Sequence, residues 1–134
     1  MHMRRAFMVA VCLAVPTVAV LFTALTAPAQ GPPEFLALKG RWVRTDGGYV
    51  IEIRGVEPGG RMQAAYYNPN PINVARAEAA RSGAAVTVFV ELRAPGYPGS
   101  TYTLIYDPKS DQLRGVYHQA SLKQNFDVIF VRGR

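Results

Sequence analysis

Short runs in which apolar and polar side chains alternate cover the chain from Arg41 onward. An alternation with period two places neighbouring side chains on opposite faces of a β-strand, so that one face is buried. Gly, Pro, Asn and Asp separate the runs at intervals of about ten residues, and no long stretch has helical period. The pattern predicts eight strands, at residues 40–45, 49–56, 61–68, 74–81, 84–93, 101–107, 112–120 and 125–132.

The connections between these strands predict antiparallel pairing. The segments DGG at 46–48, EPGG at 57–60 and DPKSD at 107–111 have the length and the turn residues of hairpin loops. A meander of eight strands has two exposed edges, and pairing the last strand with the first removes both. The sequence therefore predicts an all-β fold, an eight-stranded antiparallel up-and-down meander closed into a small barrel. A flattened two-sheet sandwich is the alternative.

The alternation also predicts which side chains point into the barrel. One face of each strand is mainly apolar, and we assign it to the interior. Its members are Trp42, Tyr49, Ile51, Ile53, Met62, Ala64, Tyr66, Val86, Val88, Val90, Leu92, Tyr102, Leu104, Tyr106, Leu113, Gly115, Tyr117, Phe126, Val128 and Phe130. The opposite face, which includes Val50, is more polar.

Five apolar residues interrupt that polar face, namely Tyr67, Phe89, Ile105, Val116 and Ile129. If they adjoin, they form more exposed apolar surface than a soluble monomer usually shows, and a second copy of the chain would cover them. If they are scattered singly, they need no partner. Both hypotheses stay open.

The amino-terminal segment has the pattern of an export signal. Arg4 and Arg5 precede an apolar run at residues 6–27, and Ala27-Pro28-Ala29 is a small-x-small cleavage pattern. We expect cleavage after Ala29 and a periplasmic or extracellular location. The alternative is a membrane anchor formed by residues 6–27, because about 20 apolar residues can cross a bilayer. The predicted organisation is a signal peptide at 1–29, a Pro/Gly linker at 30–39 and a barrel domain at 40–134.

Charge and cysteine content narrow the classes of function. Removing Arg4 and Arg5 from the 15 basic residues leaves 13 against 9 acidic residues, spread singly along the chain. Such a spread is typical of solvated strand faces, and export argues against a nucleic-acid partner. The one cysteine, Cys12, lies in the leader. The exported part therefore has no disulfide, thiol nucleophile or thiolate metal site.

The two ends of the predicted barrel carry a family resemblance. The first strand contains Gly40-x-Trp42, and the last strand ends at Arg132. In this the chain resembles the calycins, the lipocalin and avidin group, in which a basic side chain covers the tryptophan of a G-x-W motif. An arginine over a tryptophan ring also makes a cation–π contact that would join the first strand to the last. The strings YYNPNPINVA and YPGSTYTL resemble segments of exported bacterial proteins.

The resemblance implies a small barrel that holds a ligand at its open end. The chain departs from typical lipocalins because it has neither a carboxy-terminal helix nor disulfide cysteines. It also departs from avidins, because Trp42 is its one tryptophan and avidins surround biotin with several. Biotin binding is therefore disfavoured.

The segment AYYNPNPINVARAE at 65–78 is the leading candidate for a ligand-binding loop. Asn68 and Asn73 are expected at the mouth of the barrel, with Tyr66 beneath them. Tyr49, Tyr102 and Tyr117 are expected inside, where each hydroxyl needs a partner. Alanines at 64, 65, 75, 77, 79 and 80 make the third and fourth strands thin-walled, which leaves room for a ligand.

Two functions remain open at this stage. The first is binding of a small, partly apolar molecule through the inward tyrosines and the mouth asparagines. The second is a protein–protein or self-association module whose tyrosines fill the core and whose Asn-Pro segment is only a rigid turn. The loop at 93–102 is expected to be an ordinary Pro/Gly connection or a lid over the mouth.

Residues for catalysis and metal binding are few. His118 is the one histidine of the exported part and falls on the predicted outer face, and no nucleophile-elbow pattern accompanies Ser100 or Ser121. Asp107 and Asp111 flank Lys109, which would repel a cation, so this segment is predicted to be a turn. We assign no catalytic residue, metal or cofactor, and an enzyme is the least favoured function.

Overall fold

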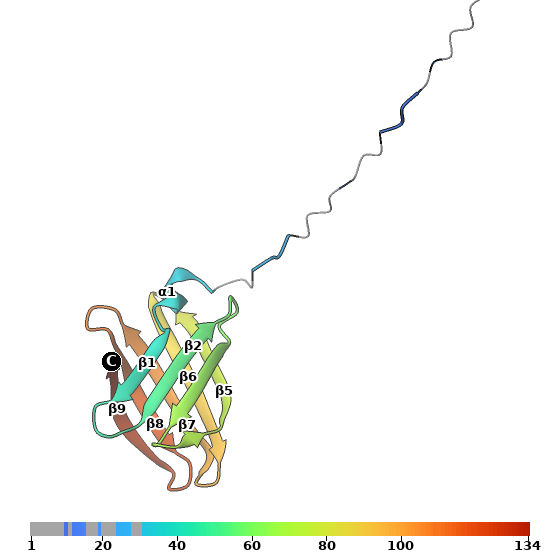
Figure 1. The fold of residues 1–134 in the computed structure, drawn as a ribbon. Helices are drawn as coiled ribbons and strands as arrows, with labels where there is room; N and C mark the ends of the chain where they lie inside the picture. Colours follow the sequence, from blue (N-terminus) through green and yellow to red (C-terminus); the bar gives the residue numbers. More distant parts are fainter. Residues whose placement is uncertain (1–9, 11, 16–18, 20–23, 28–30) are drawn as a thin grey trace, which may run out of the picture.

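The computed structural model describes residues 10, 12–15, 19, 24–27 and 31–134 (Figure 1). Most of the predicted signal peptide, including the cleavage position after Ala29, lies outside the described residues. Within the described part of the chain, no helix is both long enough and apolar enough to cross a membrane.

The elements are α1 (Pro33–Leu36), β1 (Gly40–Arg44), β2 (Val50–Val56), β3 (Met62–Tyr67), β4 (Pro71–Ile72), β5 (Val74–Ser82), β6 (Ala85–Ala94), β7 (Tyr97–Asp107), β8 (Gln112–Gln119) and β9 (Gln124–Arg132). All nine strands belong to one antiparallel sheet, in the order β4-β3-β2-β1-β9-β8-β7-β6-β5. The first strand, β1, pairs with the last, β9, with Trp42 opposite Arg132 and Val43 opposite Val131. The prediction of an all-β barrel is confirmed, and the single sheet excludes the two-sheet sandwich.

The prediction of eight strands paired in strict succession is wrong at one place. After β3 the chain turns at Asn68 and returns as the short strand β4, which pairs Ile72 with Tyr66 and Pro71 with Tyr67. β4 is two residues long, and its first residue, Pro71, has no N–H to donate to the ladder. Since β4 occupies this end of the β3 edge, β5 does not pair with β3 there. The barrel therefore has one unsealed seam.

The seam is joined only at the end far from β4. There Arg61 and Glu78 form an isolated antiparallel bridge, and the Ala79 N–H donates to the Gly60 carbonyl over 2.7 Å. Gly60 has a φ of +98°, and a Cβ at this position would lie 2.0 Å from the Ala79 oxygen. A glycine is needed here because both the backbone conformation and the close approach exclude a side chain.

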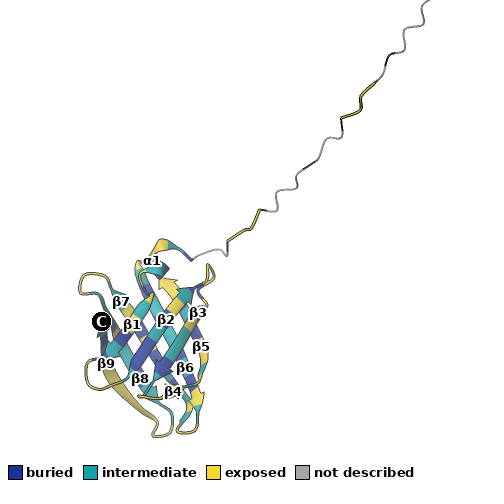
Figure 2. Cartoon of the chain, in the orientation of Figure 1, coloured by how far each residue is buried: buried dark blue, intermediate teal, exposed yellow. Residues whose placement is uncertain are grey.

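The interior prediction is largely confirmed (Figure 2). Trp42, Tyr66 and Tyr102, like most of the predicted interior, are almost fully buried. The burial of two residues differs from the prediction. Phe126, near the open start of β9, is 40% exposed, and Val50 is only 5% exposed. Val50 points outward by alternation, but on this face it lies between Val43 and Tyr67 on the two neighbouring strands.

The segment expected to be a linker contributes to the core. Phe35 in α1 and Leu38 after it are both buried. The Trp42 indole N–H donates to the Leu38 carbonyl over 2.8 Å, which satisfies the one polar atom of that ring. α1 therefore covers one end of the barrel (Figure 1).

The expected contact between Arg132 and Trp42 is present. The guanidinium carbon of Arg132 lies 4.0 Å from the centre of the Trp42 ring. The same group donates to the carbonyls of Ala37, over 2.8 Å, and Lys39, over 2.6 Å. It also forms two hydrogen bonds with Asp111, which lower the pKa of that carboxyl. One side chain thus joins β9 to β1, to the end of α1 and to the β7–β8 turn.

Replacing Gly60 tests the backbone constraint at the seam. We expect Gly60→Ala to lower the free energy of unfolding by about 1–3 kcal/mol, because alanine is strained at this φ and collides with Ala79. The matched control is Gly59→Ala, since a Cβ at Gly59 meets no atom within 4 Å. Urea denaturation measures both. Equal stability of the two variants would contradict the constraint.

Candidate ligand-binding site at the barrel mouth

The end of the barrel opposite α1 has a pocket of about 320 Å³, lined by Tyr49, Asn68, Gly96, Tyr97, Tyr117 and Gln119. These residues come from the β1–β2, β3–β4 and β6–β7 connections and from the end of β8. Successive hairpins bring them together, because every second turn of an antiparallel meander lies at the same end. We call this the mouth pocket.

Two buried tyrosines lie below the mouth pocket. The hydroxyls of Tyr66 and Tyr102 are hydrogen-bonded at 2.9 Å, and the two side chains are 1% and 0% exposed. Burial raises the pKa of both hydroxyls, and for Tyr102 the hydrogen bonds from Tyr66 and Arg44 partly oppose that rise. Both groups therefore stay neutral at ordinary pH and act as hydrogen-bonding partners.

Arg44 links this tyrosine pair to the surface. Its side chain is 8% exposed, and Nη1 donates to the Tyr102 hydroxyl over 3.1 Å. Nε and Nη2 donate to the carboxylate of Asp46 over 2.7 and 2.6 Å. Burial alone would lower the pKa of Arg44, but these hydrogen bonds raise it, and the pKa of Asp46 is lowered in turn. The guanidinium therefore remains charged and paired.

Aromatic rings surround the guanidinium and form the floor of the pocket. The carbon of the Arg44 guanidinium lies 4.2 Å from the Tyr49 ring centre and 5.6 Å from that of Tyr117. Tyr117 stacks on Tyr102 with 4.6 Å between centroids and an interplanar angle of 28°. Aromatic faces attract cations and other rings, so this floor can stack against a planar group.

The rim of the pocket carries the amide of Asn68, whose Nδ2 donates to the Tyr97 hydroxyl over 2.6 Å. Tyr97 also meets Tyr66 edge to face at 6.2 Å. Within the part of the chain that the structure describes, every buried side-chain nitrogen or oxygen has a hydrogen-bonding partner. The buried polar groups around the mouth therefore have their hydrogen-bonding partners within the protein.

The structure brings three of the six predicted binding residues to the pocket wall, namely Tyr49, Asn68 and Tyr117. Tyr66 and Tyr102 lie beneath it, where their rings pack on one another 5.7 Å apart and fill this end of the barrel. Asn73 is elsewhere: it is exposed, and its amide donates to the Arg93 carbonyl over 3.2 Å.

Sequence reasoning missed Arg44, Tyr97 and Gln119. Arg44 is two residues after Trp42 on the same strand, so period-two alternation points it inward and could have identified it. Tyr97 was missed because the loop at 93–102 is shorter than expected. β6 and β7 extend into it until Ala94 pairs with Tyr97, and the bulge between them is beside Gly99, whose φ is +87°. The segment is thus the end of a hairpin and not a long connection.

The residues considered for catalysis have other partners. Nδ1 of His118 is hydrogen-bonded to Oδ1 of Asn125 at 2.7 Å, on the outer face. The Ser100 hydroxyl, fully buried, accepts from the Ala120 N–H over 3.1 Å. In the described residues no group of three or more His, Cys, Asp or Glu side chains is placed to hold a metal ion.

Acidic residues of the DPKSD segment stabilise its turn. The carboxylate of Asp107 accepts from the Lys109 N–H over 3.0 Å and from the Ser110 hydroxyl over 2.7 Å, which lowers its pKa. Asp111 binds Arg132 and accepts from the Tyr106 hydroxyl. Both carboxylates are therefore engaged within the fold.

The apolar residues of the outer face are interleaved with polar ones. Ile105, 52% exposed, lies opposite Thr87 on one side and Arg114 on the other. Phe89 is covered by the guanidinium of Arg76, 5.0 Å from its ring centre. Tyr67 lies on β3, across the seam from β5 and β6. The five residues therefore do not form one continuous apolar row.

No family model matches this chain, and neither the curated proteins nor the solved structures contain a match. Of the features on which the resemblance to calycins was based, the structure shows the nearly closed antiparallel barrel and the Arg132–Trp42 contact.

The buried tyrosine pair makes stability depend on alkaline pH. An unfolded tyrosine ionises near pH 10, whereas the raised pKa of Tyr66 keeps its proton in the folded chain. The unfolded state therefore binds fewer protons above about pH 10, and the free energy of unfolding falls as pH rises. In Tyr66→Phe we expect this slope to be shallower by up to about 1.4 kcal/mol per pH unit. Urea denaturation between about pH 9 and pH 11.5 measures it, and an unchanged slope would refute the prediction.

Proposed function

We propose that the protein is an exported, non-catalytic binding protein that holds a small, partly apolar molecule in the mouth pocket. The observation that carries the proposal is the convergence of Tyr49, Tyr97 and Tyr117 with the amides of Asn68 and Gln119 around about 320 Å³. Ligand sites typically combine apolar or aromatic walls with a few polar groups, and this volume lies at the small end of their range.

The chemistry of the pocket favours a neutral, planar ligand. The half-buried ring of Tyr49 offers a face for stacking, and the side-chain amides offer both donors and acceptors. The charge of Arg44 is already matched by Asp46 at 2.6 Å, so an anionic ligand would have to displace that carboxylate. A compact ring with polar edges fits these conditions better than a long lipid, because the tyrosines beneath the pocket occupy the barrel interior.

A second candidate function is self-association through the outer face. It is favoured by the 52% exposure of Ile105 and by the packed tyrosines below the mouth. The polar neighbours of Ile105 weaken it, because a dimer interface would have to bury Arg114 as well.

Ligand retention tests the leading proposal. Protein purified from its host is expected to carry a small molecule that native mass spectrometry detects. Tyr49→Ala and Asn68→Ala should each weaken its retention roughly tenfold, because a stacking face or a hydrogen bond is lost. The matched controls are Tyr67→Ala on the outer face and Asn73→Ala outside the pocket. Equal loss in all four variants, or no bound molecule, would reject the proposal.

Sedimentation velocity over a wide concentration range separates the second candidate. If the mouth pocket is the functional site, we expect a monomer at all concentrations. A concentration-dependent dimer that Ile105→Lys abolishes would favour self-association instead, because a charge at the centre of an apolar contact opposes burial.

A further inference from the structure

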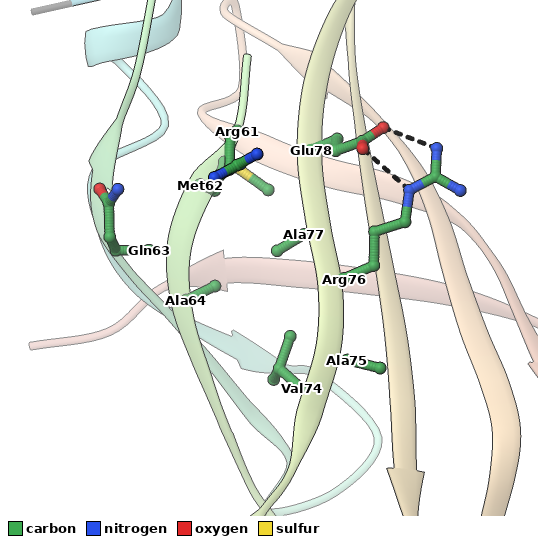
Figure 3. A pocket seen from close by; sticks show the side chains of 9 residues that line it. All are labelled: Arg61, Met62, Gln63, Ala64, Val74, Ala75, Arg76, Ala77 and Glu78. Carbon is green, nitrogen blue, oxygen red and sulfur yellow. Dashed lines mark hydrogen bonds and ion pairs between the residues drawn. The ribbon is translucent and has the colours of Figure 1, made fainter. Parts of the chain in front are cut away.

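The seam between β3 and β5 is a second concave feature, separate from the mouth. It opens into a pocket of about 510 Å³ lined by Arg61, Met62, Gln63, Ala64, Val74, Ala75, Arg76, Ala77 and Glu78 (Figure 3). The pocket follows the length over which β3 and β5 run side by side without pairing. We call it the seam pocket.

Main-chain groups on both sides of the seam pocket lack strand partners. The Gly60–Ala79 hydrogen bond sets an antiparallel register, and extending it would place Met62 opposite Ala77 and Ala64 opposite Ala75. The bridge between Arg61 and Glu78 joins the two chains beside Met62 and Ala77, but no pairing continues from it to Ala64 and Ala75. An unpaired edge of this kind is a template for another strand.

The side chains leave these two edges accessible. Ala64 and Ala77 are the small residues between the strands in Figure 3, and Arg76 and Glu78 turn away from β3. Arg76 is held there by its 2.8 Å ion pair with Glu78 and by its contact with the Phe89 ring. The β5 edge is therefore not covered by its own charged residues.

We propose that the seam pocket binds an extended segment of another polypeptide by β-strand addition, so that its backbone pairs with β3 and β5. A row of amides and carbonyls at strand spacing is recognised by a peptide backbone, in the mode known from other β-augmented complexes. A strand rises about 3.3 Å per residue, so the edge from Gln63 to Ala65, between the Arg61 bridge and β4, accommodates about three residues.

The walls of the seam pocket specify the side chains of that segment. Alternate side chains of an inserted strand point toward the barrel interior, where they meet Met62, Val74 and Ala77 and should be small and apolar. The others point outward beside Arg61. Arg61 is 79% exposed, and its nearest carboxylate, that of Glu57, is 4.0 Å away. Charge complementarity therefore favours an acidic residue at an outward position. The partner is a polypeptide with alternating small apolar and acidic residues.

Synthetic peptides test the proposal on the exported protein purified from its host. The probe is an acetylated and amidated heptapeptide that alternates valine with glutamate. The control is the same peptide with alternate backbone amides N-methylated, which keeps every side chain but blocks the ladder hydrogen bonds. We expect the probe to slow hydrogen exchange at the amides of Ala64 and Ala75, and the control to bind at least about tenfold more weakly.

A charge variant tests the predicted orientation. Arg61→Glu should weaken the probe roughly three- to tenfold, whereas Lys109→Glu in the distant β7–β8 turn should have no effect. The proposal is overturned if the two peptides bind equally or if neither binds at millimolar concentration. It is also overturned if protection appears at Tyr97 and Gln119, which would locate the peptide in the mouth pocket. Protection of the same two amides by concentration alone would identify a second copy as the occupant and equally overturn it. Because none of these readouts depends on a mouth ligand, the proposed function stands or falls separately.

Discussion

Pairing of the first strand, β1, with the last, β9, is the contact on which the rest of the structure depends. Arg132 stabilises it from outside the ladder, because the guanidinium lies 4.0 Å from the Trp42 ring and donates to two carbonyls after α1. A buried tryptophan and a shielded cation at the same place resist separation of the two strands. Because this contact seals one end of the barrel, the opposite end is free to carry the mouth. Gly31, whose N–H donates to the Val56 carbonyl, lies at the sealed end, so the described chain enters the barrel away from the mouth pocket.

The tyrosine hydroxyls require hydrogen-bonding partners, a requirement that an aliphatic core would not have. Their rings fill the barrel, yet each hydroxyl needs a partner, and an unpaired one costs about 1–3 kcal/mol. Hydrogen bonds connect Tyr66 to Tyr102, Tyr102 to Arg44 and Arg44 to the carboxylate of Asp46 at the surface. Each buried hydroxyl therefore has a partner. Such a network holds Tyr117 and Tyr49 in place around a charged group. A pocket built on this floor does not have to order its side chains when a ligand binds, which favours affinity for a small molecule.

Period-two alternation identified most of the interior, because the face on which a strand residue lies is a local property. It succeeded for Tyr66 and Tyr102 and failed at Phe126 and Val50, whose burial depends on neighbouring strands. The same limit applies to the site. Tyr97 lies at the mouth because the β6–β7 hairpin is longer than its Pro/Gly content suggests. Asn73 lies away from the mouth because it follows β4, where the chain turns toward β5. The alternation did not predict the seam, because it gives the face of each residue but not that the short strand β4 takes the place of β5 beside Tyr66 and Tyr67.

β3 connects the two pockets physically. Ala64 and Met62 form one edge of the seam, Tyr66 forms the floor beneath the mouth, and Asn68 lies on the mouth rim. On its other edge β3 is paired with β2, and its register shifts between Ile53 and Gly55, beside Gln63. On the seam side only Tyr66 and Tyr67 of β3 are paired, with β4, so β3 has fewer ladder hydrogen bonds than a central strand. A segment that completed the ladder at the seam would add hydrogen bonds to the strand that carries Tyr66 and leads to Asn68. Any coupling between the two pockets would therefore pass through this one strand.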